Sequence, residues 1–122
     1  MKKIVILLFA FGVLITACQD DDAEVVITVP QEVCDSLDIL YTNDVAAILA
    51  DAGCSGSYCH GSGAGGVTLS DYYNTKTAAD SPKFLKAIKH ESGASSMPKG
   101  GNKLSDQQIE TIECWVKSGS RE

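Results

Sequence analysis

The sequence has few aromatic residues and many glycines. Of its 122 residues only 7% are Phe, Trp or Tyr, one is tryptophan, and 11 are glycine. Such a chain builds a thin hydrophobic core, and a domain this small often needs a disulfide, a metal or a cofactor for stability. The length accommodates one small domain.

Long hydrophobic runs are also scarce. One run covers residues 4–15 after a basic start and is followed by Thr-Ala before Cys18. It is too short for a confident membrane span, and it resembles a bacterial lipoprotein signal peptide. We expect removal of residues 1–17 and diacylation of Cys18; the alternative is a plain secretory signal with an incidental cysteine. The protein is then exported and lipid-anchored, at the outer membrane, on its periplasmic or its surface face.

Basic residues are outnumbered, with 10 Lys and Arg against 16 Asp and Glu. Loss of the two lysines in the signal would take the net charge from −6 to −8. An acidic surface argues against binding of nucleic acid and against direct adhesion to anionic lipid. Membrane contact would therefore come from the lipid on Cys18.

The composition divides the exported chain in two. Residues 18–33 include an acidic run and are expected to form a solvated tether, with residues 25–29 as an edge strand or an extended segment. Residues 34–122 are expected to form the domain.

Within the domain the apolar spacing predicts helices joined by glycine-rich loops, so the expected fold class is mostly α. A helix is predicted over residues 44–52, with Gly53 ending it, and a short helical turn over residues 71–73 with Ser70 as its cap. Ser-Pro at residues 81–82 begins another helix, with Gly93 as its stop. Residues 105–108 form a capping box that opens the last helix. Trp115 on that helix is expected to pack against residues 44–52 or at a cofactor edge.

Two cysteines and a histidine share one short run. Residues 54–60 read Cys-Ser-Gly-Ser-Tyr-Cys-His, and His60 is one of only two histidines. In a Cys-x-x-Cys-His run the thiols add to the vinyl groups of haem and the histidine binds the iron. Here four residues separate Cys54 from Cys59, and the small residues 55–57 suit the bulge that the longer spacing requires. One covalent haem c is the leading interpretation.

Methionine is nearly absent too. After loss of Met1 the sole methionine is Met97, which lies in a loop before Pro98. A thioether opposite a histidine raises the haem potential and suits electron transfer. The alternatives are that Met97 fills a gap in the core, or that His90 is the distal ligand. His90 is more simply explained by a favourable interaction with the end of a helix.

Two cysteines remain when Cys18 carries lipid and Cys54 and Cys59 hold haem. A disulfide between Cys34 and Cys114 would close a long loop and stabilise the domain by roughly 4 kcal/mol in the chain-entropy model. A Cys54–Cys59 disulfide would leave the same outer pair, so the sequence does not choose between the two arrangements.

From about residue 44 to residue 120 the order of these features resembles a small class I c-type cytochrome. A helix leads into Cys54…Cys59-His60-Gly61, a Met97-Pro98 loop follows, and a helix carrying Trp115 closes the domain. The chain is most similar to cytochrome c-like domains of bacterial lipoproteins with this cysteine spacing.

The resemblance implies a helical domain wrapped around one haem. Cys54 and Cys59, or Cys59 alone, would form the thioethers, His60 the proximal bond and Met97 the distal bond. Such a protein carries single electrons between redox partner proteins and is not an enzyme. It could meet an acidic partner through a patch of lysines, although lysines are more often a solvated helix face; these are Lys76, Lys83, Lys86 and Lys89.

Two other functions stay open. If Met97 does not bind the iron, the open iron position would suit a haem sensor or a peroxidase-like protein. The chain lacks a well-placed second histidine to assist such chemistry. A haem-free binding lipoprotein would hold Cys54 and Cys59 as a disulfide. A variant of this hypothesis has zinc bound by Cys54, Cys59, His60 and His90. It is disfavoured because thiols tend to form disulfides in an oxidising compartment.

Overall fold

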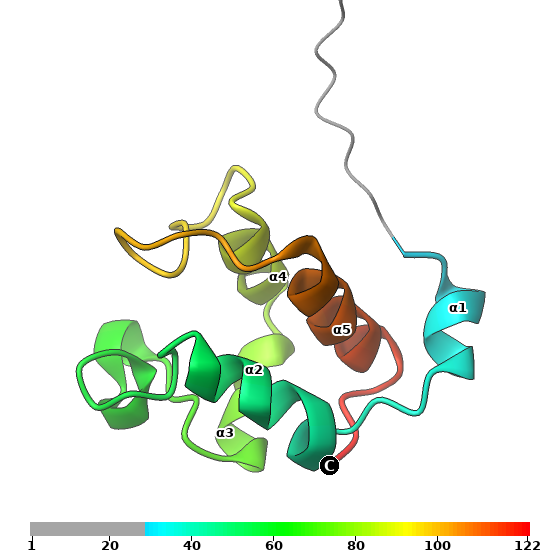
Figure 1. Cartoon of the computed structure of the whole chain (residues 1–122). Helices are drawn as coiled ribbons and strands as arrows, with labels where there is room; N and C mark the ends of the chain where they lie inside the picture. The colour runs from blue at the N-terminus through cyan, green and yellow to red at the C-terminus, as the bar shows by residue number, and fades with distance from the viewer. Residues whose placement is uncertain (1–28) are drawn as a thin grey trace, which may run out of the picture.

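The computed structural model describes residues 29–122, and these residues form a small helical domain in which no strand is found (Figure 1). The predicted mostly α fold class is confirmed. The predicted signal peptide and Cys18 lie outside the described residues, as do residues 18–28 of the predicted tether and residues 25–28 of the predicted edge strand. No helix of the described part is long and apolar enough to cross a membrane. The elements in chain order are α1 (Gln31–Ser36), the π-helical turn η1 (Tyr41–Val45), α2 (Ala46–Asp51), the 3-10 turns η2 (His60–Ser62) and η3 (Ala64–Gly66), α3 (Tyr72–Ala79), α4 (Pro82–Lys89) and α5 (Asp106–Lys117).

Local capping sets the starts of the later helices. The Ser105 hydroxyl accepts a hydrogen bond from the Gln108 backbone N–H at 3.2 Å, and the Gln108 side chain accepts one from the Ser105 N–H at 3.0 Å, which is the predicted capping box. The helix α4 begins at Pro82 behind the Ser81 cap, as predicted. The cap of α3 is Asp71 instead of Ser70, and this helix is longer than the predicted turn.

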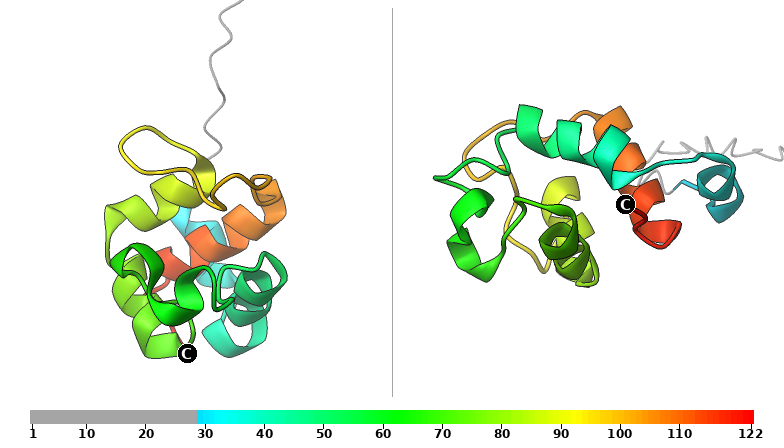
Figure 2. Two further views of the ribbon diagram at one scale, coloured as in Figure 1. Left: turned by 90° about the vertical axis from the view of Figure 1, so that its left-hand side faces the viewer. Right: turned by 90° about the horizontal axis from the view of Figure 1, so that it is seen from below.

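The core lies where α5 packs against η1 and α2 (Figure 2). Trp115 is fully buried, and its ring lies 6.0 Å from the ring of Tyr41, centroid to centroid. The indole N–H donates to the Arg121 carbonyl oxygen at 2.7 Å, so its one polar group is satisfied. Val45 and Leu49 belong to the same buried cluster. Trp115 therefore joins α5 to the helical segment that η1 and α2 form together. Packing against this segment was the first of the two roles predicted for it.

A disulfide ties α1 to α5 at the edge of this core. Cys34 and Cys114 are both buried and their sulfur atoms are 2.06 Å apart. The Ser118 hydroxyl donates to the Cys34 carbonyl oxygen at 3.2 Å and so supports the same junction. The disulfide expected from the cysteine count is therefore present, and α1 begins at Gln31, three residues before the predicted start of the domain.

Replacing both Cys34 and Cys114 with alanine should lower the free energy of unfolding by about 4 kcal/mol, because the 80-residue separation leaves a long loop open in the unfolded chain. Urea unfolding measures the loss, and a Ser36→Ala variant serves as a control on α1 outside the junction. An unchanged midpoint, or both cysteines free to alkylation in the denatured, non-reduced protein, would contradict the bond.

A buried carboxylate joins α4 to α5. Glu113 is only 3% exposed and pairs with Lys89 at 2.7 Å and with Lys117 at 2.9 Å. Burial by itself raises the pKa of Glu113, but hydrogen bonds and charges from the two lysines outweigh it and leave the pKa below its ordinary value of 4.5. The carboxylate is therefore charged at neutral pH, and two cations surround it.

The Glu113 ion pairs should make the domain less stable in acid. Since the folded pKa is below the unfolded one, their contribution is fully present above pH 4.5 and is lost as the pH falls through the folded pKa. In a Glu113→Gln variant the free energy of unfolding at pH 7 should fall by about 3 kcal/mol, and it should decline less steeply in acid. Urea unfolding between pH 3 and pH 7, with the half-buried Glu110→Gln on the same helix as the control, measures both effects. Equal slopes for Glu113→Gln and the parent protein would refute this role.

Candidate haem site

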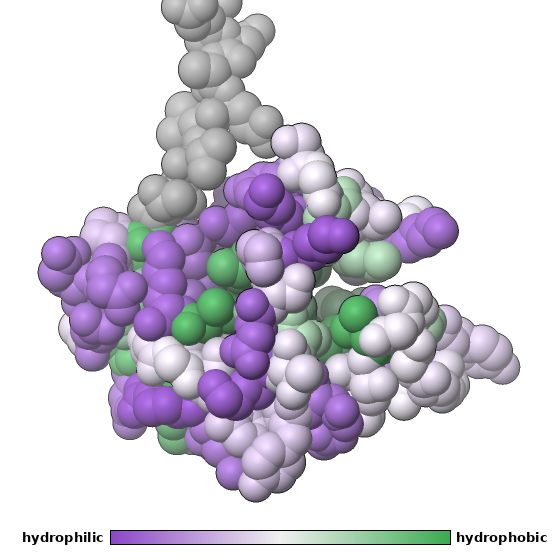
Figure 3. Space-filling model, turned by 180° about the vertical axis from the view of Figure 1, so that it is seen from behind, coloured by the Kyte–Doolittle hydropathy of each residue, from purple (hydrophilic) through white to green (hydrophobic). Residues whose placement is uncertain are grey.

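A cavity of about 640 Å³ lies between the loop that follows α2 and the loop that follows α4 (Figure 3). Figure 3 shows it as a deep notch with apolar side chains at its floor. Its volume is in the range of protein sites for small molecules and cofactors, about 300–1,000 Å³. Most of its wall is apolar, from side chains of α2, α3, α4 and the adjoining loops: Leu49, Val67, Leu69, Ala78, Phe84, Ala87, Ile88 and Ala94.

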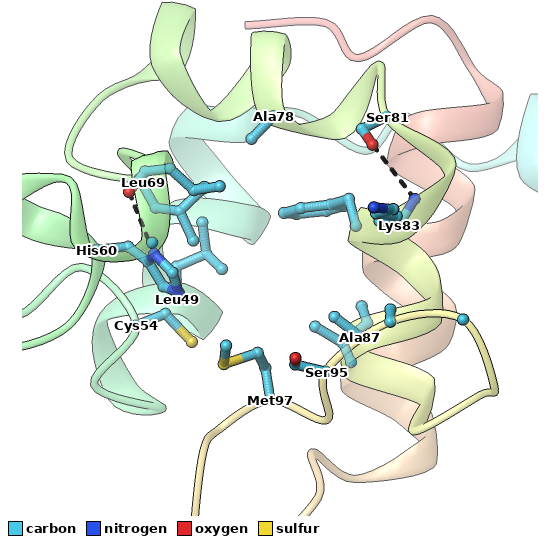
Figure 4. A pocket seen from close by; sticks show the side chains of 16 residues that line it. Leu49, Cys54, His60, Leu69, Ala78, Ser81, Lys83, Ala87, Ser95 and Met97 are labelled. Atoms are coloured by element: carbon cyan, nitrogen blue, oxygen red, sulfur yellow. Dashed lines mark hydrogen bonds between the residues drawn. The ribbon is translucent and has the colours of Figure 1, made fainter.

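Three of the predicted site residues line this cavity. Cys54 and His60 come from the loop after α2, and Met97 comes from the loop after α4 (Figure 4). In Figure 4 the Met97 side chain extends from its loop toward Cys54 and His60. Cys59 and His90 do not line the cavity. The fold thus brings together residues that are 43 positions apart in the sequence, 54 and 97.

Backbone contacts fix the orientation of His60. Its carbonyl oxygen accepts a hydrogen bond from the Leu69 N–H at 2.9 Å, and its ring Nδ1 lies 3.1 Å from the Val67 carbonyl oxygen. Because a carbonyl oxygen can only accept, Nδ1 carries a proton, and in the neutral ring Nε2 keeps its lone pair. A histidine held by its other ring nitrogen in this way is oriented for binding a metal.

The four-residue spacing between the cysteines forms a closed, hydrogen-bonded loop. The His60 N–H donates to the Cys54 carbonyl oxygen at 2.9 Å, and the Gly61 N–H donates to that of Gly56 at 3.0 Å. A Cβ at Gly61 would collide with the Ser55 carbonyl oxygen, so only glycine fits directly after the histidine. The sequence motif includes Gly61 but does not show this close approach, which depends on how the loop folds back.

The two thiols of the motif occupy different environments. Cys54 is 9% exposed at the cavity wall, whereas Cys59 is exposed, and both are free thiols. Burial, together with the nearby Cys59, raises the pKa of the Cys54 thiol, with a backbone hydrogen bond acting in the opposite direction. Cys54 is therefore uncharged at neutral pH. The structure contains no Cys54–Cys59 disulfide, which the haem-free alternative requires.

The two candidate distal ligands differ in position. Met97 is half-buried and lines the cavity, and its backbone N–H donates to the Ala87 carbonyl oxygen at 3.0 Å. His90 is exposed, ends α4, and has its ring Nε2 2.9 Å from the Met97 carbonyl oxygen. The geometry favours Met97 over His90 as the residue that reaches a cavity-bound metal.

The four lysines proposed as a docking patch are not equivalent. Lys89 is paired with buried Glu113, and Lys76 donates to the Gly119 carbonyl oxygen at 3.2 Å. Lys83 lines the cavity, and among residues 29–122 it is the only Lys, Arg, Asp or Glu that does so. Lys76 and Lys89 thus serve contacts within the domain, whereas Lys83 and Lys86 are exposed.

The zinc variant also needs residues that the fold keeps apart. Across residues 29–122 no group of three or more His, Cys, Asp or Glu side chains is placed to hold a metal ion. His60 lines the cavity, whereas His90 lies outside it, bonded to the Met97 backbone.

Comparisons with known proteins identify no family for this chain. No protein-family model matches it, and no curated protein or solved structure matches it either. What the cavity binds must therefore be inferred from its own residues.

Proposed function

We propose that this chain is a monohaem c-type cytochrome that carries one electron at a time between partner proteins, and that it is not an enzyme. One observation carries the proposal. His60, with an unprotonated Nε2, and Met97, with its thioether, come from separate loops and line the same apolar cavity. Imidazole and thioether are the axial pair of electron-transfer haems with raised potential.

The residues present fit haem c in donor chemistry, in size and in polarity. His60 would be the proximal ligand and Met97 the distal ligand, and Cys54 is placed at the wall to form a thioether. Cys59 would form the second thioether by turning from its exposed position toward the cavity. Haem c, when bound, supplies an iron that alternates between the ferric and ferrous states and so carries one electron.

The remaining side chains set the surroundings. Leu49, Leu69 and Phe84 form apolar walls, which would exclude water from the ligands around a bound haem. Exclusion of water lowers the polarity around a redox centre and thereby tunes its potential. No Asp or Glu of the described part of the chain lines the cavity, so residues 29–122 offer it no carboxylate as a catalytic acid or base.

We further propose that the protein is exported and held at the outer membrane by a lipid on Cys18. The residues before Cys18 support this proposal, and the Cys34–Cys114 disulfide fits an oxidising compartment. Redox proteins would be the partners, and the acidic net charge of −6 argues against nucleic acid. Cys18→Ala should release the protein from the membrane fraction, and an unchanged distribution would refute the anchor.

Covalent haem is tested by a pyridine haemochrome spectrum after acid-acetone extraction, on protein made in cells that attach haem c. Retained haem is the expected result, and the position of the α band tells whether one or both thioethers have formed. Absence of retained haem, despite competent maturation, would overturn the proposal and favour the haem-free binding lipoprotein.

The two thiols should contribute unequally to that retention. Cys54→Ser should reduce the covalently retained haem severalfold more than Cys59→Ser, because Cys54 already lies at the cavity wall and Cys59 must turn toward it. The same spectrum, taken on both variants at equal protein, measures the difference. A larger loss in Cys59→Ser would show that Cys59 is the principal attachment point.

A further inference from the structure

We propose that His90 is a positioning residue that holds the Met97 loop at the cavity, and so keeps Met97 bound to the iron. This inference rests on the proposed function. His90 lines no part of the cavity and its ring is directed to a backbone carbonyl oxygen. Its role is therefore exerted through Met97.

The backbone of Met97 is held on both sides by the C-terminal end of α4. Its N–H donates to the Ala87 carbonyl oxygen at 3.0 Å, and its carbonyl oxygen accepts from His90 Nε2 at 2.9 Å. These two bonds fix the peptide groups on either side of the Met97 Cα atom. The backbone that carries the Met97 thioether is thereby tied to α4 by two hydrogen bonds.

The backbone of His90 points to the same role. His90 is the C-cap of α4 and adopts the left-handed conformation, with φ of 61°. Glycine is the usual residue at such a helix end, and a histidine there carries a steric cost. Glycine has no side chain, whereas the imidazole ring of His90 reaches the backbone of Met97, seven residues further along the chain.

The hydrogen bond does not depend on the charge of the ring. A carbonyl oxygen can only accept, so the neutral ring makes this bond in the tautomer that has its proton on Nε2. The charged ring has a proton on Nε2 as well. The bond therefore persists whether the ring is neutral or charged, and His90 acts as a constant restraint. Ordering a ligand in advance raises its effective affinity, because less conformational freedom is lost when it binds.

His90→Gly separates the ring from the backbone conformation. Glycine adopts the left-handed conformation without strain, so α4 can end as before while the ring is lost. His90→Asn is a second variant, since asparagine tolerates this conformation but is too short to replace the ring. Ser96→Ala is the control, because Ser96 is an exposed, uncharged residue of the same loop.

Two measurements on the purified protein test the proposal. The first is the affinity of the ferric haem protein for added imidazole, which competes with Met97 for the iron. Loss of one hydrogen bond should raise that affinity roughly five- to tenfold in both His90 variants and leave it unchanged in Ser96→Ala. The second is hydrogen exchange at the Met97 amide, which should accelerate by a similar factor.

The outcomes separate this proposal from the proposed function. Unchanged exchange at Met97, or faster exchange with unchanged imidazole affinity, would overturn the role of His90 while leaving the cytochrome intact. A parent protein that retains no haem would overturn the proposed function, and with it the role of His90 toward the iron; the exchange measurement would then test the backbone restraint alone. General destabilisation would accelerate exchange at Ile88 inside α4 as well, and would refute a specific role.

Discussion

A His60→Ala variant should fail to accumulate with haem attached. Of the two histidines in the chain only His60 lines the cavity, so alanine removes its imidazole ring and with it the Nδ1–H bond to the Val67 carbonyl oxygen. The cavity then has no proximal ligand, and the segment that carries His60 loses its link to residue 67. Without proximal ligation the iron is left to Met97 alone.

The haem content per polypeptide measures this loss, by pyridine haemochrome against an immunoblot for the chain. Ser62→Ala is a matched control, because Ser62 is exposed two residues further along and should retain a normal haem content. A normal content in His60→Ala would eliminate the proposed site, since no other histidine lines the cavity.

The second large effect is expected at Met97. Met97→Ala should lower the midpoint potential by on the order of 0.2 V, because loss of the thioether removes the ligand that favours the reduced iron. The open position should also bind added imidazole or carbon monoxide and give a high-spin spectrum in their absence.

Redox titration and absorption spectra measure both consequences of the Met97 change. Ser96→Ala, one residue earlier in the same loop, should leave the potential and the spectrum as they are in the parent protein. An unchanged potential in Met97→Ala would remove Met97 from the iron. A high-spin spectrum already present in the parent protein would favour the haem sensor or peroxidase-like alternative instead.

Helix starts were predictable where the capping contacts are local. The Ser105 box and the Ser81-Pro82 start depend on hydrogen bonds or backbone angles within a few residues, so the sequence contains all of their causes. The helix predicted from residue 44 instead begins as a π-helical turn at Tyr41. The Tyr41 N–H donates to the Arg121 carbonyl oxygen at 3.0 Å, and its ring meets Trp115, so contacts some 80 residues away extend this helix.

The end of α4 is a second helix boundary that local sequence did not predict. Gly93 was the predicted stop, because glycine is the commonest residue in the left-handed conformation. The helix ends at Lys89 with His90 as its left-handed cap, three residues earlier. At this earlier end of α4 the His90 ring bonds to the Met97 carbonyl oxygen, in the loop that follows. The path of that loop cannot be predicted from local propensities, so neither can the bond.

The helical class, the chemistry of the candidate ligands and the pair of cysteines left for a disulfide could all be predicted from the amino-acid sequence. These properties follow from residue type, spacing and count. The folded chain was needed to show that Cys54 lies at the cavity and Cys59 outside it, and that Met97 lines the cavity while His90 bonds to its backbone. Burial and hydrogen bonding at a site depend on segments distant in the chain, and these segments meet only when the core around Trp115 is packed.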